Sequence, residues 1–112
     1  MKARDQALLW MAQRFSAMVL ALCIMVHLIT IIYAVRNGLS AAEILGRTRG
    51  SYGWFAFYSM FVAAVAVHAP IGLRTIASEM LGWRGAAPDR MALAAGIALA
   101  WGGMRAVFGM FA

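Results

Sequence analysis

The sequence has few charged residues and almost no cysteine. Only 12% of its 112 residues are Asp, Glu, Lys or Arg, whereas 64% are hydrophobic. This ratio excludes a water-soluble globule, and it also excludes an intrinsically disordered chain, which would be poor in apolar residues. The single cysteine, Cys23, has no disulfide partner in the chain and is expected to be a buried thiol. These limits leave an integral membrane protein.

Acidic residues are scarcer than basic ones. Ten Lys and Arg stand against four Asp and Glu, for a net charge of +6. In a soluble protein this excess would indicate a nucleic-acid partner, but here the basic residues flank apolar runs and are typical of anchors at a membrane surface. We therefore expect a lipid bilayer and no nucleic acid. A small proton-coupled exporter is disfavoured because it needs a carboxylate inside the membrane, and all four acidic residues lie outside the apolar runs.

Three apolar runs are long enough to cross a bilayer. The first, residues 15–35, holds no charge and as a helix would measure about 31 Å, close to a hydrocarbon core of about 30 Å. The second covers residues 53–73, and the third covers residues 91–112 with Arg105 near enough to its end to reach the interface. The sequence thus predicts an all-α membrane protein of three transmembrane helices, up-down-up, packed with partner-subunit helices. It forms a single membrane-anchor domain over residues 1–112.

The two connections are polar and contain turn residues. Ser40-Ala41-Ala42-Glu43 matches a capping box and predicts a short interfacial helix in the first connection. With a cytoplasmic N-terminus, six basic residues fall on the cytoplasmic side (Lys2, Arg4, Arg14, Arg74, Arg84, Arg90) and four on the other (Arg36, Arg47, Arg49, Arg105). We therefore expect a multi-pass protein of the bacterial inner membrane whose N-terminus is cytoplasmic.

The two histidines, His27 and His68, lie well inside the first and second spans, where an ionisable side chain is costly unless protein groups satisfy it. Helical spacing gives His27 a face of small or polar residues and His68 a face of aromatic and small residues. These are Ser16, Cys23, Thr30 and Ala34 in the first case, and Phe57, Phe61, Ala64 and Gly72 in the second. A neutral imidazole with room beside it for a flat macrocycle is what axial ligation of haem iron requires. The alternative is a structural histidine that bonds a neighbouring helix.

The two histidines differ in depth. If Arg14 and Arg74 mark the same surface, His27 lies about 20 Å and His68 about 9 Å from it, a difference of about 10 Å. Two ligands of one iron must share a level, so these two would not hold one haem within a single chain. Either two haems are stacked across the membrane or one histidine is structural. The remaining axial ligands must come from a partner subunit or a second copy.

Small residues recur at helical spacing in the third span. Ala92, Gly96, Ala100 and Gly103 form a ridge of the kind that lets membrane helices approach closely. Gly102 and Gly109 lie one heptad apart on the same span. We assign the ridge to association with the partner, and the alternative is a loosely packed glycine-rich helix.

Two segments resemble the cytochrome b membrane anchor of succinate dehydrogenase and fumarate reductase. They are Arg14-Phe15-Ser16-Ala17, with His27 eleven positions after Ser16, and Val67-His68-Ala69-Pro70-Ile71-Gly72-Leu73-Arg74. The resemblance covers about residues 10–82, which include two of the three spans.

The resemblance implies a cofactor, a substrate and partners. It implies one or two haems b shared with a partner chain, with His68 and His27 as axial ligands and Arg74 paired with a propionate. It further implies that Ser16 and Arg14 hydrogen-bond a quinone. The partners would be soluble iron–sulfur and flavoprotein subunits and a second membrane anchor chain or a second copy. The chain would then transfer electrons between the iron–sulfur subunit and membrane quinone.

The chain also departs from the family pattern. Gln13 stands where many relatives have His, Ala17 replaces Gly, and Thr75 replaces a second His. These changes leave the assignment of His68 intact and bear on the quinone site, where Ser16 has packing and the arginines have interface anchoring as plain alternatives. Other functions left open are a haem anchor of another membrane dehydrogenase or hydrogenase, and a haem-free small transporter or assembly protein.

Overall fold

Three long helices and one short helix account for most of the chain. The computed structural model describes residues 2–112, in which α1 spans Ala3–Arg36, α2 Ala41–Thr48, α3 Tyr52–Glu79 and α4 Ala87–Phe111. Residues 2–112 contain no strand. Helices α1, α3 and α4 are each long and apolar enough to cross a membrane. The predicted all-α membrane fold with three spans is confirmed.

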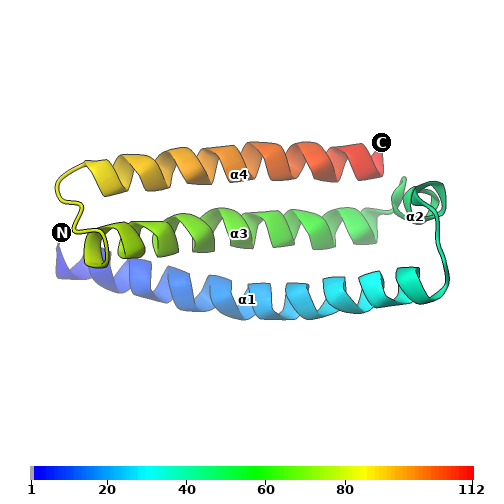
Figure 1. Cartoon of the computed structure of the whole chain (residues 1–112), viewed down its shortest axis with the longest axis horizontal. Coiled ribbons are helices and arrows are strands. Elements are labelled where there is room, and N and C mark those ends of the chain that lie inside the picture. Colours follow the sequence, from blue (N-terminus) through cyan, green and yellow to red (C-terminus); the bar gives the residue numbers. More distant parts are fainter. Residues whose placement is uncertain (1) are drawn as a thin grey trace.

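Helix α3 lies between α1 and α4 and runs antiparallel to both (Figure 1). The N-terminus and the α3–α4 connection lie at one end of the bundle, and α2 and the C-terminus lie at the other. The order is therefore up-down-up. This arrangement places the start of α1, the end of α3 and the start of α4 on one side of the membrane.

Helix α1 is longer than its apolar run. It begins at Ala3, twelve residues before the run, and its 34 residues measure about 51 Å against a hydrocarbon core of about 30 Å. The helix continues outward because the preceding segment is rich in strong helix formers such as Ala, Leu and Gln. At its other end, Gly38 with φ 63° closes a Schellman motif in which the Leu39 N–H donates to the Ala34 carbonyl at 3.0 Å.

The short helix α2 begins where the capping box predicts. The Ser40 hydroxyl accepts from the Glu43 N–H at 3.2 Å, and the Glu43 carboxylate accepts from the Ser40 N–H at 3.4 Å. The last residue of α2 and the connection that follows it hold the end of α4. Thr48 Oγ1 donates to the Met110 carbonyl at 3.1 Å, and the Gly50 N–H donates to the Phe111 carbonyl at 2.9 Å.

Small side chains make up most of the buried interior. The buried apolar residues are Leu20, Cys23, Ala64, Ala77, Ala92 and Val107, and Cys23 is completely buried as expected. The small face predicted for α1 packs on α3, since Ser16 and Cys23 are both buried there. Close helix approach through small residues replaces the bulky core of a soluble bundle, because lipid offers no hydrophobic incentive to bury large side chains.

The ridge of α4 packs against α3 of the same chain, so its assignment to a partner was wrong. A Cβ added at Gly103 would lie 2.7 Å from Val62 Cγ1, and one added at Gly96 would lie 3.1 Å from Pro70 Cγ. The Gly96 position would also be 3.4 Å from the Ala66 carbonyl oxygen, whose helical donor Pro70 removes. The sequence indicated a close helix contact correctly, but spacing alone does not say which helix makes it.

The tight contact at Gly103 yields a stability prediction. Gly103→Ala should lower the stability of the α3–α4 pair by about 1–3 kcal/mol, because Val62 is β-branched and cannot turn away from the added methyl. Thermal unfolding in detergent micelles measures the change. Gly109→Ala is the matched control, since nothing lies within 4 Å of its added Cβ. Equal stability of the two variants would contradict the packing described here.

Candidate functional site

Both histidines lie at the α1–α3 interface, and each contacts a hydroxyl of the opposite helix. His68 of α3 meets Ser16 of α1, and His27 of α1 meets Tyr58 of α3. Both contacts use the Nδ1 atom of the imidazole. The interface therefore contains two crossed pairs, with one imidazole and one hydroxyl contributed by each helix.

The first pair contains the more buried hydroxyl. Ser16 is 4% exposed, and its Oγ lies 3.5 Å from His68 Nδ1. The same Oγ donates to the Gln13 carbonyl, one turn earlier in α1, at 3.1 Å. His68 itself is part-buried. Ser16 and His68, both predicted as site residues, are thus brought together.

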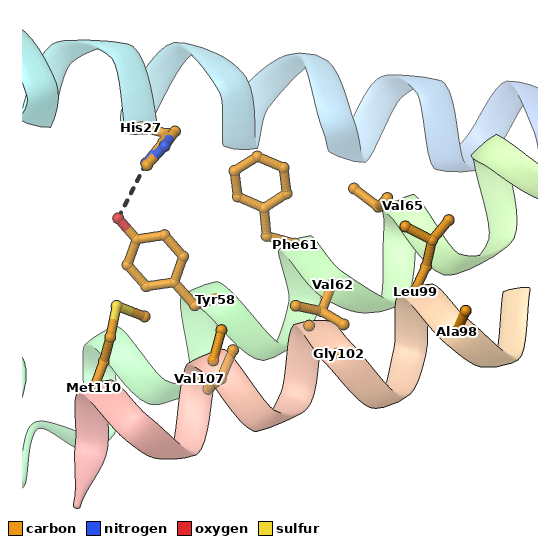
Figure 2. A pocket seen from close by; sticks show the side chains of 12 residues that line it. His27, Tyr58, Phe61, Val62, Val65, Ala98, Leu99, Gly102, Val107 and Met110 are labelled. Carbon is orange, nitrogen blue, oxygen red and sulfur yellow. Dashed lines mark hydrogen bonds between the residues drawn. The ribbon is translucent and has the colours of Figure 1, made fainter. Parts of the chain in front are cut away.

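The second pair is surrounded by aromatic rings. His27 Nδ1 lies 3.1 Å from the Tyr58 hydroxyl, and the imidazole meets the rings of Tyr58 and Phe61 edge-on, with centroids 5.7 and 5.6 Å away (Figure 2). Phe61 was expected beside His68 because the two share a helix face. Phe61 precedes His68 by seven residues, about 10 Å along α3, so it lies level with His27 instead.

The two pairs lie at separate depths, as predicted. His27 is eleven residues from Ser16 along α1, and Tyr58 is ten residues from His68 along α3, so the pairs are about 15–17 Å apart. The separation exceeds the expected 10 Å because Arg74 lies farther out than Arg14. With Ser16 opposite His68, Arg14 falls level with about residue 70. The two imidazoles of one chain do not converge on one point.

An apolar groove of about 420 Å³ opens beside the second pair. Figure 2 shows the imidazole of His27 reaching from α1 toward Tyr58 on α3, with residues of α4 forming the opposite wall. The α4 wall includes Gly102, Val107 and Met110. The volume lies in the range of small-molecule and cofactor sites.

A second apolar groove of about 330 Å³ lies between α1 and α3 near the first pair. Ser16 is the one polar residue among the eight that line it, which are Ala12, Phe15, Ser16, Val19, Met60, Ala63, Ala64 and Val67. Such a groove fits an apolar chain.

The two arginines expected at the site lie apart from the histidines. The guanidinium of Arg14 lies over the Trp10 ring, 5.0 Å from its centroid, and Arg14 is exposed. Arg74 forms an ion pair with Asp89 at the start of α4. Both arginines lie in the half of the bundle that carries the start of α1, and each already has a partner.

The residues at the first pair fit an axially ligated haem in their donor chemistry. One imidazole nitrogen of His68 is engaged, and the other has no hydrogen-bond partner within residues 2–112. Close by on α1, the buried Gln13 Oε1 has no donor among the described residues, so it is available to a donor from a ligand or partner. No group of three or more His, Cys, Asp or Glu side chains that could hold a metal ion occurs in residues 2–112. A haem would be held by single imidazoles and not by such a group, so this finding does not test a haem site.

Sequence reasoning missed Tyr58. It lies off the face of α3 that carries His68, and a tyrosine near a membrane interface is commonly a belt residue. The antiparallel register of α1 and α3 could have located it. Pairing Ser16 with His68 places the residue opposite His27 at position 57 or 58.

A comparison with protein-family models identifies the chain. The model of the succinate dehydrogenase/fumarate reductase transmembrane subunit matches residues 1–108, which include both histidine pairs, the first two spans and most of the third. No curated protein and no solved structure matches the chain. The family resemblance noted for residues 10–82 is thereby confirmed and extends to the third span. With three helices that can span a membrane, the chain belongs to the family of succinate dehydrogenase/fumarate reductase transmembrane subunits.

Proposed function

We propose that the chain is the haem b-carrying membrane anchor of a succinate dehydrogenase/fumarate reductase-type complex, and that it transfers electrons between a soluble iron–sulfur subunit and membrane quinone. The observation that supports this most is the state of His68. Its imidazole lies inside a membrane span, is held through Nδ1 alone, and has Nε2 free of protein partners within residues 2–112. An imidazole oriented through one nitrogen and open at the other is the usual state of a metal-ligating histidine.

His68 is the axial ligand in this proposal, and His27 is the ligand of a second haem at its own level. A bound haem supplies one-electron redox chemistry whose potential depends on its ligands and burial. The chain orients each imidazole with a hydroxyl and surrounds it with apolar residues. Since the two levels are about 15–17 Å apart, a haem held by either histidine would need a second ligand from a partner anchor chain or a second copy.

The soluble redox centres belong to other subunits in this proposal. Iron–sulfur clusters are held by several cysteine thiolates, and this chain has one cysteine, which is buried between helices. The flavoprotein and iron–sulfur subunits would dock at the end of the bundle that carries the N-terminus. This end is cytoplasmic in the proposed orientation in the bacterial inner membrane, which rests on the six-to-four distribution of basic residues.

The quinone site is proposed at the same end. The 330 Å³ groove bordered by Ser16 offers room for an apolar isoprenoid tail, and the exposed guanidinium of Arg14 is available to a carbonyl oxygen after leaving the Trp10 ring. Arg74 would turn from Asp89 to a haem propionate, an exchange of one carboxylate for another that costs little at a partly exposed site.

The haem assignment is tested by the absorption spectrum. Dithionite-reduced minus oxidised difference spectra of the purified complex should show a b-type haem that is lost in His68→Ala, because the iron loses its ligand. His27→Ala should remove a second haem and leave the first. Unchanged haem content in both variants would end the proposal. Loss in His68→Ala alone would identify an anchor with a single haem.

The quinone assignment is tested by kinetics. Arg14→Ala should raise the KM for quinone by about tenfold or more, since a hydrogen bond from a charged donor contributes about 1.5–3 kcal/mol. Succinate-driven quinone reduction by the purified complex measures this. Arg36→Ala, at the opposite end of α1, is the matched control and should leave KM unchanged. An unchanged KM in Arg14→Ala would place the quinone elsewhere.

A further inference from the structure

The Ser16 hydroxyl has a single proton, and an acceptor for it lies one turn earlier in the same helix. The hydroxyl donates to the Gln13 carbonyl at 3.1 Å, a bond within α1 that needs no partner from another helix. A backbone carbonyl can only accept, so the direction of this bond is fixed. Ser16 is also 4% exposed, so no lipid or solvent group competes for the proton.

The direction of the second contact follows. Because the hydroxyl proton is on the Gln13 side, Ser16 Oγ can only accept from the imidazole of His68, 3.5 Å away. The His68 tautomer that fits this direction carries its proton on Nδ1. A neutral imidazole that carries its proton on Nδ1 has its lone pair on Nε2.

We propose that Ser16 is a positioning residue for His68. By accepting the Nδ1 proton across the α1–α3 interface, it selects the tautomer whose Nε2 can bind iron and holds the plane of the ring. This inference rests on the proposed haem at His68, and it gives Ser16 a role different from the quinone contact that the family resemblance implies. A serine whose proton is held by the Gln13 carbonyl has none to donate to a quinone.

In the His27–Tyr58 pair, the direction of the hydrogen bond is not fixed in this way. The Tyr58 hydroxyl lies 3.1 Å from His27 Nδ1, and within residues 2–112 it has no second acceptor that would fix the direction of the bond. Only the Ser16–His68 pair combines an imidazole contact with a second bond that orients the hydroxyl. This difference makes the haem at His68 the one whose properties depend on a serine.

Removing the acceptor should change the haem itself. A hydrogen bond from Nδ1 makes the imidazole a stronger electron donor and stabilises ferric iron, so Ser16→Ala should raise the midpoint potential. It should also weaken haem retention by roughly tenfold, the lower range found for partners of metal-ligating histidines. Ser16→Thr keeps the hydroxyl, has the 330 Å³ groove beside it for the extra methyl, and should restore both properties.

The experiment is a redox titration of the purified, quinone-depleted complex, followed through the b-haem absorption and the EPR signal of ferric haem. Wild type, Ser16→Ala, Ser16→Thr and Ser59→Ala are compared. Ser59 of α3 is the matched control, since its buried hydroxyl has no partner among the described residues. We expect a raised potential and an altered EPR signal in Ser16→Ala only.

Each contrary result has its own meaning. Wild-type potential and EPR signal in Ser16→Ala, with haem still lost in His68→Ala, would overturn the positioning role and leave the proposed function standing. Absence of haem from the wild-type complex would overturn the proposed function itself. If Ser16→Ala does not assemble, Ser16→Thr and Ser16→Cys are compared instead. The cysteine thiol is a weaker hydrogen-bond acceptor than the threonine hydroxyl, so Ser16→Cys should shift the midpoint potential more. Equal shifts in the two variants would contradict the proposal.

Discussion

Both imidazoles lie inside helices long and apolar enough to span a membrane, and this location constrains how α1 and α3 fit together. An imidazole in hydrocarbon must find its hydrogen-bond partner in protein, and here each finds it on the opposite helix. Two such pairs, separated by eleven residues on α1 and ten on α3, fix both the register and the rotation of the two helices. A shift of one helical turn would leave both histidines without partners at once.

The other interface is fixed by shape. Gly96 and Gly103 allow α4 to reach α3 so closely that even a methyl at Gly103 would overlap Val62. The contact near Gly96 lies against Pro70 and the carbonyl that Pro70 leaves without a donor, so the irregular turn of α3 is covered by protein. Helix α3 is thus held by polar pairs on one side and by glycine contacts on the other. The histidines proposed as haem ligands lie on the polar side.

Much of this arrangement could be predicted from the sequence, because the signals are strong and local. Run length and charge predict three spans, Ser40 and Glu43 predict α2, and the two intramembrane histidines predict polar contacts between helices. The helix ends were less predictable, since hydropathy marks the membrane and α1 continues beyond it. Three features depend on three-dimensional register, which no local pattern records. These are the packing of the Gly96–Gly103 ridge within the chain, the placement of Phe61 beside His27, and the contact of Tyr58 with His27.

The link between α2 and α3 has a consequence for biosynthesis. Thr48 and Gly50 donate to the last carbonyls of α4, although some sixty residues separate them along the chain. When these donors leave the ribosome, α4 has not yet been made, so the link must wait in a polar environment until the third span is inserted. Closure of this end of the subunit therefore follows synthesis of the third span, and a chain that stalls before Met110 would leave the link unfixed.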